Sequence, residues 1–175
     1  ASSAASDVYK RQAMGDCAIN IKPSEDELVE IAGEASKCAK IFGVDPQVAF
    51  LSYSTHGSGK GEDVDKMCNA ARKAKEKYPD LPIDGELQFD AAVSPRVART
   101  KCPDSNVAGH ANTFIFPDIN AGNIGYKIAQ RMGNFEAYGP ILLGLNAPVN
   151  DLSRGCNASE VYSMAIITAA LANNI

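Results

Sequence analysis

The fold is decided by one stretch, residues 48–77, which reads VAFLSYSTHGSGKGEDVDKMCNAARKAKEK. It opens with four apolar residues, Val48–Leu51, a length and composition typical of a buried strand. A polar loop that contains glycine, Ser52–Gly59, follows. Charged and apolar residues then recur at helical spacing and predict an amphipathic helix over about Glu62–Lys77. Strand, loop and helix in this order form one unit of a parallel sheet that is covered by helices.

The same order recurs on both sides of this unit. Upstream, Ser24 and Glu27 have the spacing of a capping box, and the helix that they predict ends at Gly43. Upstream of that helix, Asp16–Asn20 has the composition of a strand end. Downstream, we expect strands that end at Ile83 or span Thr113–Phe116 and Tyr138–Leu145, and helices over about 95–100, 124–132 and 158–172. The alternation predicts an α/β fold with a parallel or mostly parallel sheet.

Composition excludes several classes of protein. The chain has 175 residues and a formal net charge of −4, and nucleic-acid binding would require a surplus of positive charge. Its longest apolar run, near Met164–Leu171, is too short to span a membrane, so we expect neither nucleic acid nor membrane as a partner. The five cysteines include no CxxC pair, which favours free thiols in a reducing cytosol. With only two histidines, no metal site is expected.

Three polar loops follow predicted strands, where ligands of parallel sheets bind. The loop Ser52–Gly59 resembles a phosphate cradle but lacks the spacing of a P-loop, so an ordinary connection is the alternative. In the loop Asp118–Asn123, Asn120 either contacts a ligand or caps the next helix. Lys127 and Arg131, one helical turn apart, either face an anionic substrate or lie in solvent.

The third loop, Asn150–Gly155, is the densest in polar groups. It places Asp151, Ser153 and Arg154 just before a helix, and a guanidinium group is well suited to a phosphate or a developing oxyanion. The alternative is a capping loop in which Asp151 pairs with Arg154 at the surface, an ion pair worth less than about 1 kcal/mol. Composition alone leaves both interpretations open.

Four longer motifs surround these loops: SYSTHGSG at 52–59, DGELQFDAAV at 84–93, SNVAGHANTFIFPDINAGNIGYKIAQR at 105–131 and YGPILLGLNAPVNDLSRGCN at 138–157. Over about residues 15–175 the chain resembles the C-terminal half of the phosphate acetyltransferase (phosphotransacetylase) family. The resemblance implies a three-layer helix-sheet-helix fold of the isocitrate/isopropylmalate dehydrogenase-like kind, present as a fragment. It also implies reversible acetyl transfer, in which acetyl-CoA and phosphate give CoA and acetyl phosphate.

The resemblance also implies roles for the loop residues. Ser153 and Arg154 would meet the charge that grows on the carbonyl oxygen and the phosphate. Glu160 stands where the family has an Asp that removes the proton of the CoA thiol. Glu160 also lies three residues after Asn157, as in a capping box, so base and helix cap both stay open. The expected substrate-binding residues are Asn150, Asp151, Asn120, Asn123, Lys127 and Ser54.

Further expectations rest on the same resemblance. Acetyl-CoA, CoA, phosphate and acetyl phosphate would be substrates, with no tightly bound cofactor, and the protein would be a cytoplasmic homodimer. Residues 1–12 resemble a spurious leader, residues 13–138 would be the second α/β domain of the family, and residues 139–175 would complete a first domain that is largely absent. In that case Tyr138–Leu145 and the last helix expose apolar surface. Two alternatives stay open: a phosphate butyryltransferase, and a non-catalytic acyl-CoA-sensing domain of a malic enzyme.

Overall fold

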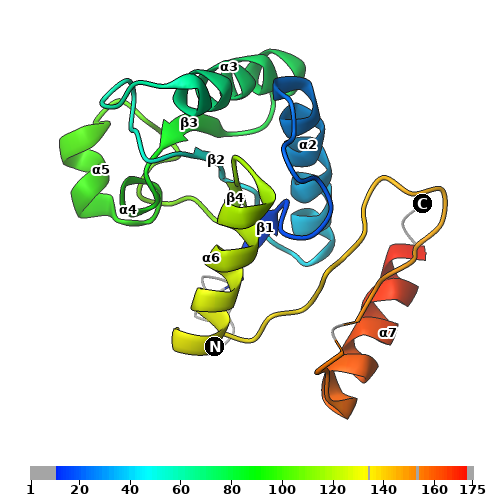
Figure 1. Cartoon of the computed structure of the whole chain (residues 1–175). Coiled ribbons are helices and arrows are strands. Elements are labelled where there is room, and N and C mark those ends of the chain that lie inside the picture. Colours follow the sequence, from blue (N-terminus) through cyan, green and yellow to red (C-terminus); the bar gives the residue numbers. More distant parts are fainter. Residues whose placement is uncertain (1–10, 134, 153, 173–175) are drawn as a thin grey trace. The chain divides into compact units, whose positions relative to one another are not determined.

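The computed structural model describes residues 11–133, 135–152 and 154–172 and divides into two compact units, Ala1–Asn123 and Ile124–Ile175. The first unit contains a four-stranded parallel sheet with the strand order β1-β4-β2-β3 (Figure 1). The strands are β1 Ala13–Gly15, β2 Val48–Leu51, β3 Ile83–Leu87 and β4 Thr113–Ile115. Val48 in β2 pairs with Ile83 on one side and with Thr113 on the other, so β2 is a central strand. The predicted α/β fold with a parallel sheet is confirmed.

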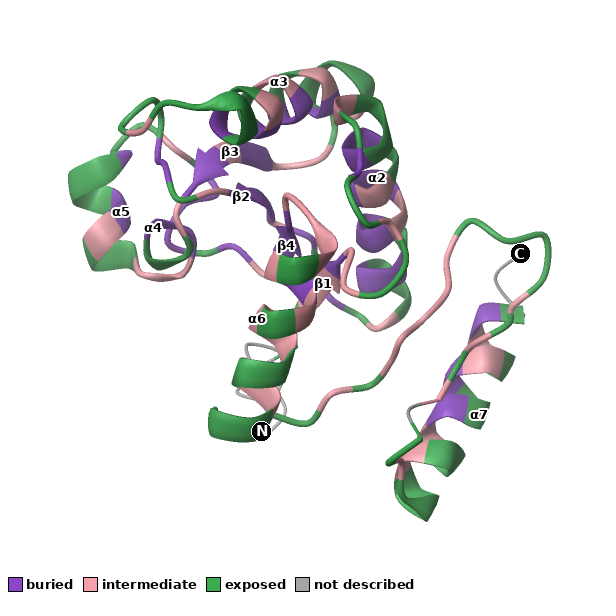
Figure 2. Ribbon diagram, in the orientation of Figure 1, coloured by how far each residue is buried: buried purple, intermediate pink, exposed green. Residues whose placement is uncertain are grey.

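Alternation along β2 explains why helices cover both faces of the sheet. Val48 and Phe50 point into one apolar core, whereas Ala49 and Leu51 point into another. Helices α2 (Glu25–Ile41) and α3 (Glu62–Lys77) cover the first core, and α4 (Phe89–Val93) and α5 (Pro95–Lys101) cover the second. Figure 2 shows the buried strands between these helices. This unit therefore has the predicted layers of helix, sheet and helix.

Helices α2 and α3 begin and end close to where the sequence predicts. Ser24 caps α2 with the reciprocal contacts of a capping box to Glu27. Lys73 of α3 bridges to Glu25 at 2.9 Å and to Asp26 at 2.8 Å, so charged side chains join the two helices above their shared apolar face. These ion pairs are exposed and add little stability, because solvent screens them. The packed apolar face is what holds the two helices to the sheet.

Several elements in the first unit differ from the expectation. Strand β3 begins rather than ends at Ile83, because Asp84–Leu87 continues the pairing with β2. Helix α4 was not predicted, because five residues are too few for a periodic signal. No strand covers Asp16–Asn20: the Asp16 carboxylate accepts the backbone N–H groups of residues 18, 19 and 20, which folds this segment into a turn.

The second unit contains most of α6 (Ile119–Met132), which begins in the first unit, and α7 (Ala158–Ala172). The buried strand predicted over Tyr138–Leu145 is wrong. Within the described residues of this segment, pairing is limited to an isolated antiparallel bridge between Ile141 and Asn150. Gly139 and Gly144 have φ angles of 154° and 74°, and Pro140 lacks an N–H group, so the segment cannot run as a regular strand.

The second unit exposes much of its apolar surface, as the sequence predicts. Tyr138 and Leu145 are each 50% exposed, and Tyr162 on α7 is 70% exposed. Helix α7 buries Met164, Ile167 and Leu171 but exposes Val161 and Ile166. Apolar side chains therefore lie around most of the circumference of α7 rather than on one face.

Candidate functional site

The loop after β2 is held by one buried carboxylate. Glu86 of β3 is 2% exposed, and its Oε1 atom accepts hydrogen bonds from the Ser54 hydroxyl at 2.8 Å and from the Gly57 N–H at 2.7 Å. The Ser54 hydroxyl in turn accepts the N–H of Gly59 at 2.8 Å. Ser54 is completely buried, so these contacts give it a structural role in the loop. Its predicted contact with a substrate stays a prediction.

The backbone donors of this loop are also used within the protein. The N–H groups of residues 54–59 donate to Ser52 Oγ, Ser58 Oγ, the Glu86 carbonyl oxygen, the Glu86 carboxylate, the Thr55 carbonyl oxygen and Ser54 Oγ, in that order. A phosphate cradle needs such groups unpaired and pointing at the anion. The geometry therefore favours the ordinary connection over the phosphate cradle.

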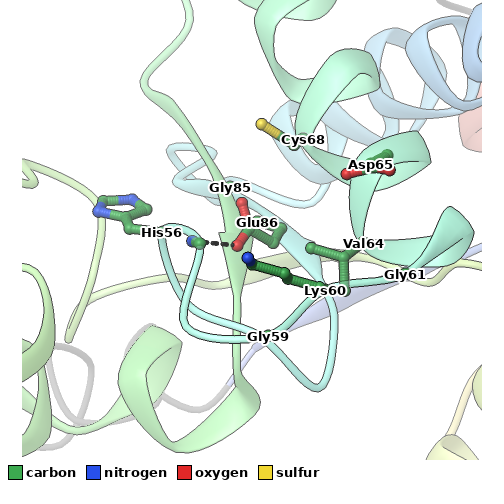
Figure 3. A pocket seen from close by; sticks show the side chains of 10 residues that line it. His56, Gly59, Lys60, Gly61, Val64, Asp65, Cys68, Gly85 and Glu86 are labelled. Atoms are coloured by element: carbon green, nitrogen blue, oxygen red, sulfur yellow. Dashed lines mark hydrogen bonds between the residues drawn. The ribbon is translucent and has the colours of Figure 1, made fainter.

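A cavity of about 490 Å³ lies beside this loop, between the start of α3 and β3 (Figure 3). Its polar lining includes Lys60, Asp65, Cys68 and Glu86. Burial, followed by the charge of Glu86 and a hydrogen bond to it, raises the pKa of the Cys68 thiol. A raised thiol pKa keeps this cysteine protonated and poorly nucleophilic at neutral pH.

A second buried carboxylate, Asp84, gathers three side chains from separate parts of the chain. It accepts Lys75 Nζ at 3.0 Å and Ser105 Oγ at 2.5 Å, and its Oδ2 atom lies 3.2 Å from His56 Nε2. Burial raises the pKa of Asp84, but the hydrogen bonds from Ser105 and Lys75 outweigh it and hold this pKa below its ordinary value. An ionised Asp84 fixes the Nε2 proton on His56, so the cluster ties the loop, α3 and β3 together.

Sequence reasoning missed Asp84 and Glu86 because it ended the strand at Ile83. The signal was present: the run IDGEL has an apolar residue at each end, and an isolated glycine within a strand pattern is compatible with a strand. Polar residues inside such a short strand are buried only when they are paired. Both carboxylates meet this condition in the structure.

The start of α6 is organised by Asp118 rather than by Asn120. The Asp118 carboxylate accepts the N–H of Ala121 at 3.0 Å, so Asp118 caps the helix and the predicted cap at Asn120 is wrong. Asn120 is exposed, whereas Asn123 donates its side-chain amide to the Cys17 carbonyl oxygen at 3.1 Å. Helix α6 thus begins at Ile119, five residues earlier than predicted, because aspartate is a favoured N-cap residue.

The second unit brings several of the predicted residues to one hollow of about 170 Å³. Lys127 and Arg131 of α6 line it together with Glu160 of α7. Leu152 and Gly155, which flank Ser153 and Arg154 in the sequence, line it as well. Lys127 is exposed, and its ammonium group lies 5.7 Å from the ring centre of Tyr126. Both cations line the same hollow, and the choice between a substrate-facing and a solvated role stays a prediction.

The loop before α7 carries the remaining predicted residues, although Ser153 lies outside the described residues. Arg154 is exposed, and no ion pair between described residues includes it. Asp151 accepts the N–H of its neighbour Leu152 at 2.8 Å and does not pair with Arg154, so the surface ion pair considered above is absent. Asn150 is half-buried, and its side chain bonds to Leu142 and Thr168. Contact of Arg154 with an anion stays a prediction.

Glu160 takes part in a capping box at the start of α7. Its Oε2 atom accepts the N–H of Asn157 at 2.8 Å, and its own N–H donates to Asn157 Oδ1 at 3.0 Å. The geometry of the helix cap is thus present. The carboxylate is half-exposed and lines the hollow, so its role as a base stays a prediction.

Two general features of the described residues bear on the class of site. Across residues 11–133, 135–152 and 154–172, no three His, Cys, Asp or Glu side chains gather in a way that could hold a metal ion. In the same part of the chain, every helix is too short or too polar to cross a bilayer.

Comparisons with known proteins identify the family of the chain. The sequence profile of the family described as "Phosphate acetyl/butaryl transferase" matches residues 5–169. The phosphate acetyltransferase of Bacillus subtilis (strain 168) is 61% identical over 157 residues, which cover 90% of this chain and 49% of that protein. The chain thus spans about half the length of the curated relatives it matches.

Solved structures show the same similarity in three dimensions. The crystal structure of a phosphotransacetylase from Streptococcus pyogenes has a TM-score of 0.89 and 61% identity, covering 91% of this chain and 49% of that one. The EutD phosphotransacetylase from Staphylococcus aureus has a TM-score of 0.88 and 52% identity, covering 93% of this chain and 51% of that one.

Proposed function

Because the chain belongs to the phosphate acetyltransferase and butyryltransferase family, we propose that it carries part of the site for reversible acetyl transfer between CoA and phosphate. One observation carries the proposal. In the second unit, Arg154 is exposed and forms no ion pair with a described residue, and its loop lines the same hollow as Lys127 and Glu160. An anion-binding pair and a carboxylate are the groups that this reaction needs.

The cations would act on the charge that develops during transfer. Attack of the CoA thiolate on acetyl phosphate places negative charge on the carbonyl oxygen and on the departing phosphate. The guanidinium group of Arg154 can donate two parallel hydrogen bonds to such oxygens, and Lys127 adds a point charge. Removing one donor of this kind lowers turnover by about 10²–10³-fold in enzymes. Ser153 would donate alongside Arg154.

The carboxylate would act on the proton. A free thiol has a pKa of about 8.5, so a base must take the proton of CoA at neutral pH. The cap uses one oxygen of Glu160, Oε2, and leaves the second carboxylate oxygen unbonded to any described residue. We propose that this second oxygen receives the thiol proton, so that cap and base are compatible.

The acyl group is proposed to be acetyl. The name of the family covers both acetyl and longer acyl groups, but the relatives at 55–61% identity are named phosphate acetyltransferase. The names of these relatives do not favour a butyryltransferase or the acyl-CoA-sensing domain of a malic enzyme. Comparing the rates with acetyl-CoA and butyryl-CoA tests the preference directly.

The finer expectations stay proposals that rest on the family resemblance. They comprise a homodimer in the cytoplasm, the absence of a tightly bound cofactor and the isocitrate/isopropylmalate dehydrogenase-like classification of the fold. The division at residues 138 and 139 is also a proposal. Substrate contacts remain proposed for Asp151, Asn120, Asn123 and Ser54, whereas Asn150 bonds within the protein through both polar ends of its side chain.

Arg154→Ala tests the proposed function, with Arg72→Ala as a matched control. The assay follows acetyl-CoA formation from acetyl phosphate and CoA, by the chain and by a hybrid in which it replaces the matching half of the Bacillus subtilis enzyme. We expect Arg154→Ala to lower kcat by at least about 10²-fold. Arg72 forms only an exposed pair with Glu76, so its replacement should leave kcat unchanged. An active hybrid that is insensitive to Arg154→Ala would contradict the proposal.

A further inference from the structure

We propose that Asn150 and Thr168 form a clasp that fixes the segment carrying Ser153 and Arg154. On this inference Thr168 is a positioning residue, and its importance for turnover rests on the proposed function. Thr168 lies on α7, more than three helical turns beyond the cap, and sequence reasoning gave it no role. The contacts that carry the inference all lie within the second unit.

The clasp consists of three hydrogen bonds with fixed directions. The Thr168 hydroxyl donates its proton to the Met164 carbonyl oxygen at 2.8 Å, within α7. Its oxygen can then only accept, and it accepts the Asn150 side-chain amide at 2.8 Å. This orients the Asn150 carbonyl toward the Leu142 N–H, which donates to it at 2.9 Å. The side chain of Asn150 thus joins α7 to the segment before the loop.

The other end of the loop is held as well. Asn157 and Glu160 exchange the two hydrogen bonds of the capping box at the first turn of α7. The eleven residues from Asn157 to Thr168 correspond to about 16 Å along the helix. The seven steps from Asn150 to Asn157 span at most about 25 Å. The segment is longer than the distance that it bridges, but both of its ends are tied to α7, so Arg154 can occupy fewer positions than it could on a segment tied at one end.

This arrangement gives Asn150 a different role from the one predicted. Both polar ends of its side chain bond within the protein, so neither needs a substrate. The inference therefore assigns Asn150 to holding the loop, together with Thr168. The rate of group transfer depends on how well a charged donor is positioned, because a displacement of about 1 Å can lower turnover about 10²-fold.

Thr168→Val tests the inference on the 175-residue chain because it keeps the shape of the side chain and removes the hydroxyl. Thr100→Val is the matched control: Thr100 also contacts the carbonyl oxygen four residues earlier in its helix, but it accepts no side chain. The readouts are hydrogen exchange of the Leu142 amide and the NMR signal of the Arg154 amide. In Thr168→Val we expect Leu142 to exchange about fivefold faster, as loss of one ~1 kcal/mol hydrogen bond implies, and the Arg154 signal to move.

Rescue separates positioning from general stability. Thr168→Ser keeps the hydroxyl, so it should restore both readouts, and Thr100→Val should change neither. Equal exchange of Leu142 in Thr168→Val and Thr100→Val would overturn the clasp, as would failure of Ser to restore it. If Thr168→Val does not fold, Thr168→Ala also removes the hydroxyl, with Thr100→Ala as its control, and gives the same comparison. A folded hybrid without acetyl transfer would overturn the proposed function, whereas these exchange rates still decide the clasp.

Discussion

Replacing Glu160 by Gln separates its role as a base from its role as a helix cap. Gln keeps a carbonyl oxygen that can accept the Asn157 N–H, so most of the cap survives. The lost charge at the start of α7 is worth about 0.5 kcal/mol of folding stability, within the usual range for a helix N-terminus. A lost general base instead lowers turnover by about 10²–10⁴-fold. The two roles therefore differ by orders of magnitude in rate.

The chain provides its own control for this comparison. Glu27 forms the same capping box with Ser24 at the start of α2, with its Oε2 atom 2.7 Å from the Ser24 nitrogen. We expect Glu27→Gln and Glu160→Gln to cost the same small stability in urea unfolding. Only Glu160→Gln should slow acetyl-CoA formation in the hybrid enzyme. If its kcat stays within about twofold of that of Glu27→Gln, Glu160 is a cap and not the base.

Three further predictions concern the first unit. The pKa of Asp84 lies below its ordinary value of 3.8, so its stabilising contribution is complete above that pH and is lost as the pH falls through the lower, folded value. In urea unfolding, the difference in unfolding free energy between the wild-type chain and Asp84→Asn should be constant near pH 7 and should shrink below about pH 4. A difference that grows in acid would contradict this assignment. Gly122→Ala places a Cβ atom against the Asp16 carbonyl oxygen and should cost about 1–3 kcal/mol in the same assay, whereas a neutral effect would refute so close an approach. Ser54→Ala leaves the Glu86 carboxylate with one donor fewer and should cost about 2 kcal/mol, which a melting temperature equal to that of the wild-type chain would disprove.

The sequence predicts well those elements whose signal is local. Strand β2 and helix α3 have the predicted bounds, because a four-residue apolar run and a long amphipathic pattern are each complete within themselves. The prediction ended strand β3 too early because its buried acids, Asp84 and Glu86, depend on partners tens of residues away in the sequence. The strand predicted over Tyr138–Leu145 was wrong for a related reason, because an apolar run becomes a strand only when another strand pairs with it.

The candidate site likewise has parts that the sequence predicts and parts that depend on distant contacts. The family resemblance assigned Lys127, Arg154 and Glu160 to one site, and the hollow in the second unit has Lys127, Glu160 and both neighbours of the Ser153–Arg154 pair in its lining. Sequence alone does not reveal that the backbone N–H groups of the Ser52–Gly59 loop donate their hydrogen bonds within the protein. Nor does it reveal the contact of Thr168 with Asn150, because the direction of a hydroxyl depends on the packed structure.

The apolar side chains around α7 affect the heat capacity of unfolding. The heat capacity of unfolding rises with the apolar area that is newly hydrated, and ordinary domains reach about 12–15 cal/mol/K per residue. Tyr162 and Ile166 are already 70% and 52% exposed in the native chain, so water surrounds them before unfolding begins. The second unit should therefore melt with a small heat-capacity step and a shallow dependence of stability on temperature. Binding of any macromolecule that shields α7 would steepen that dependence.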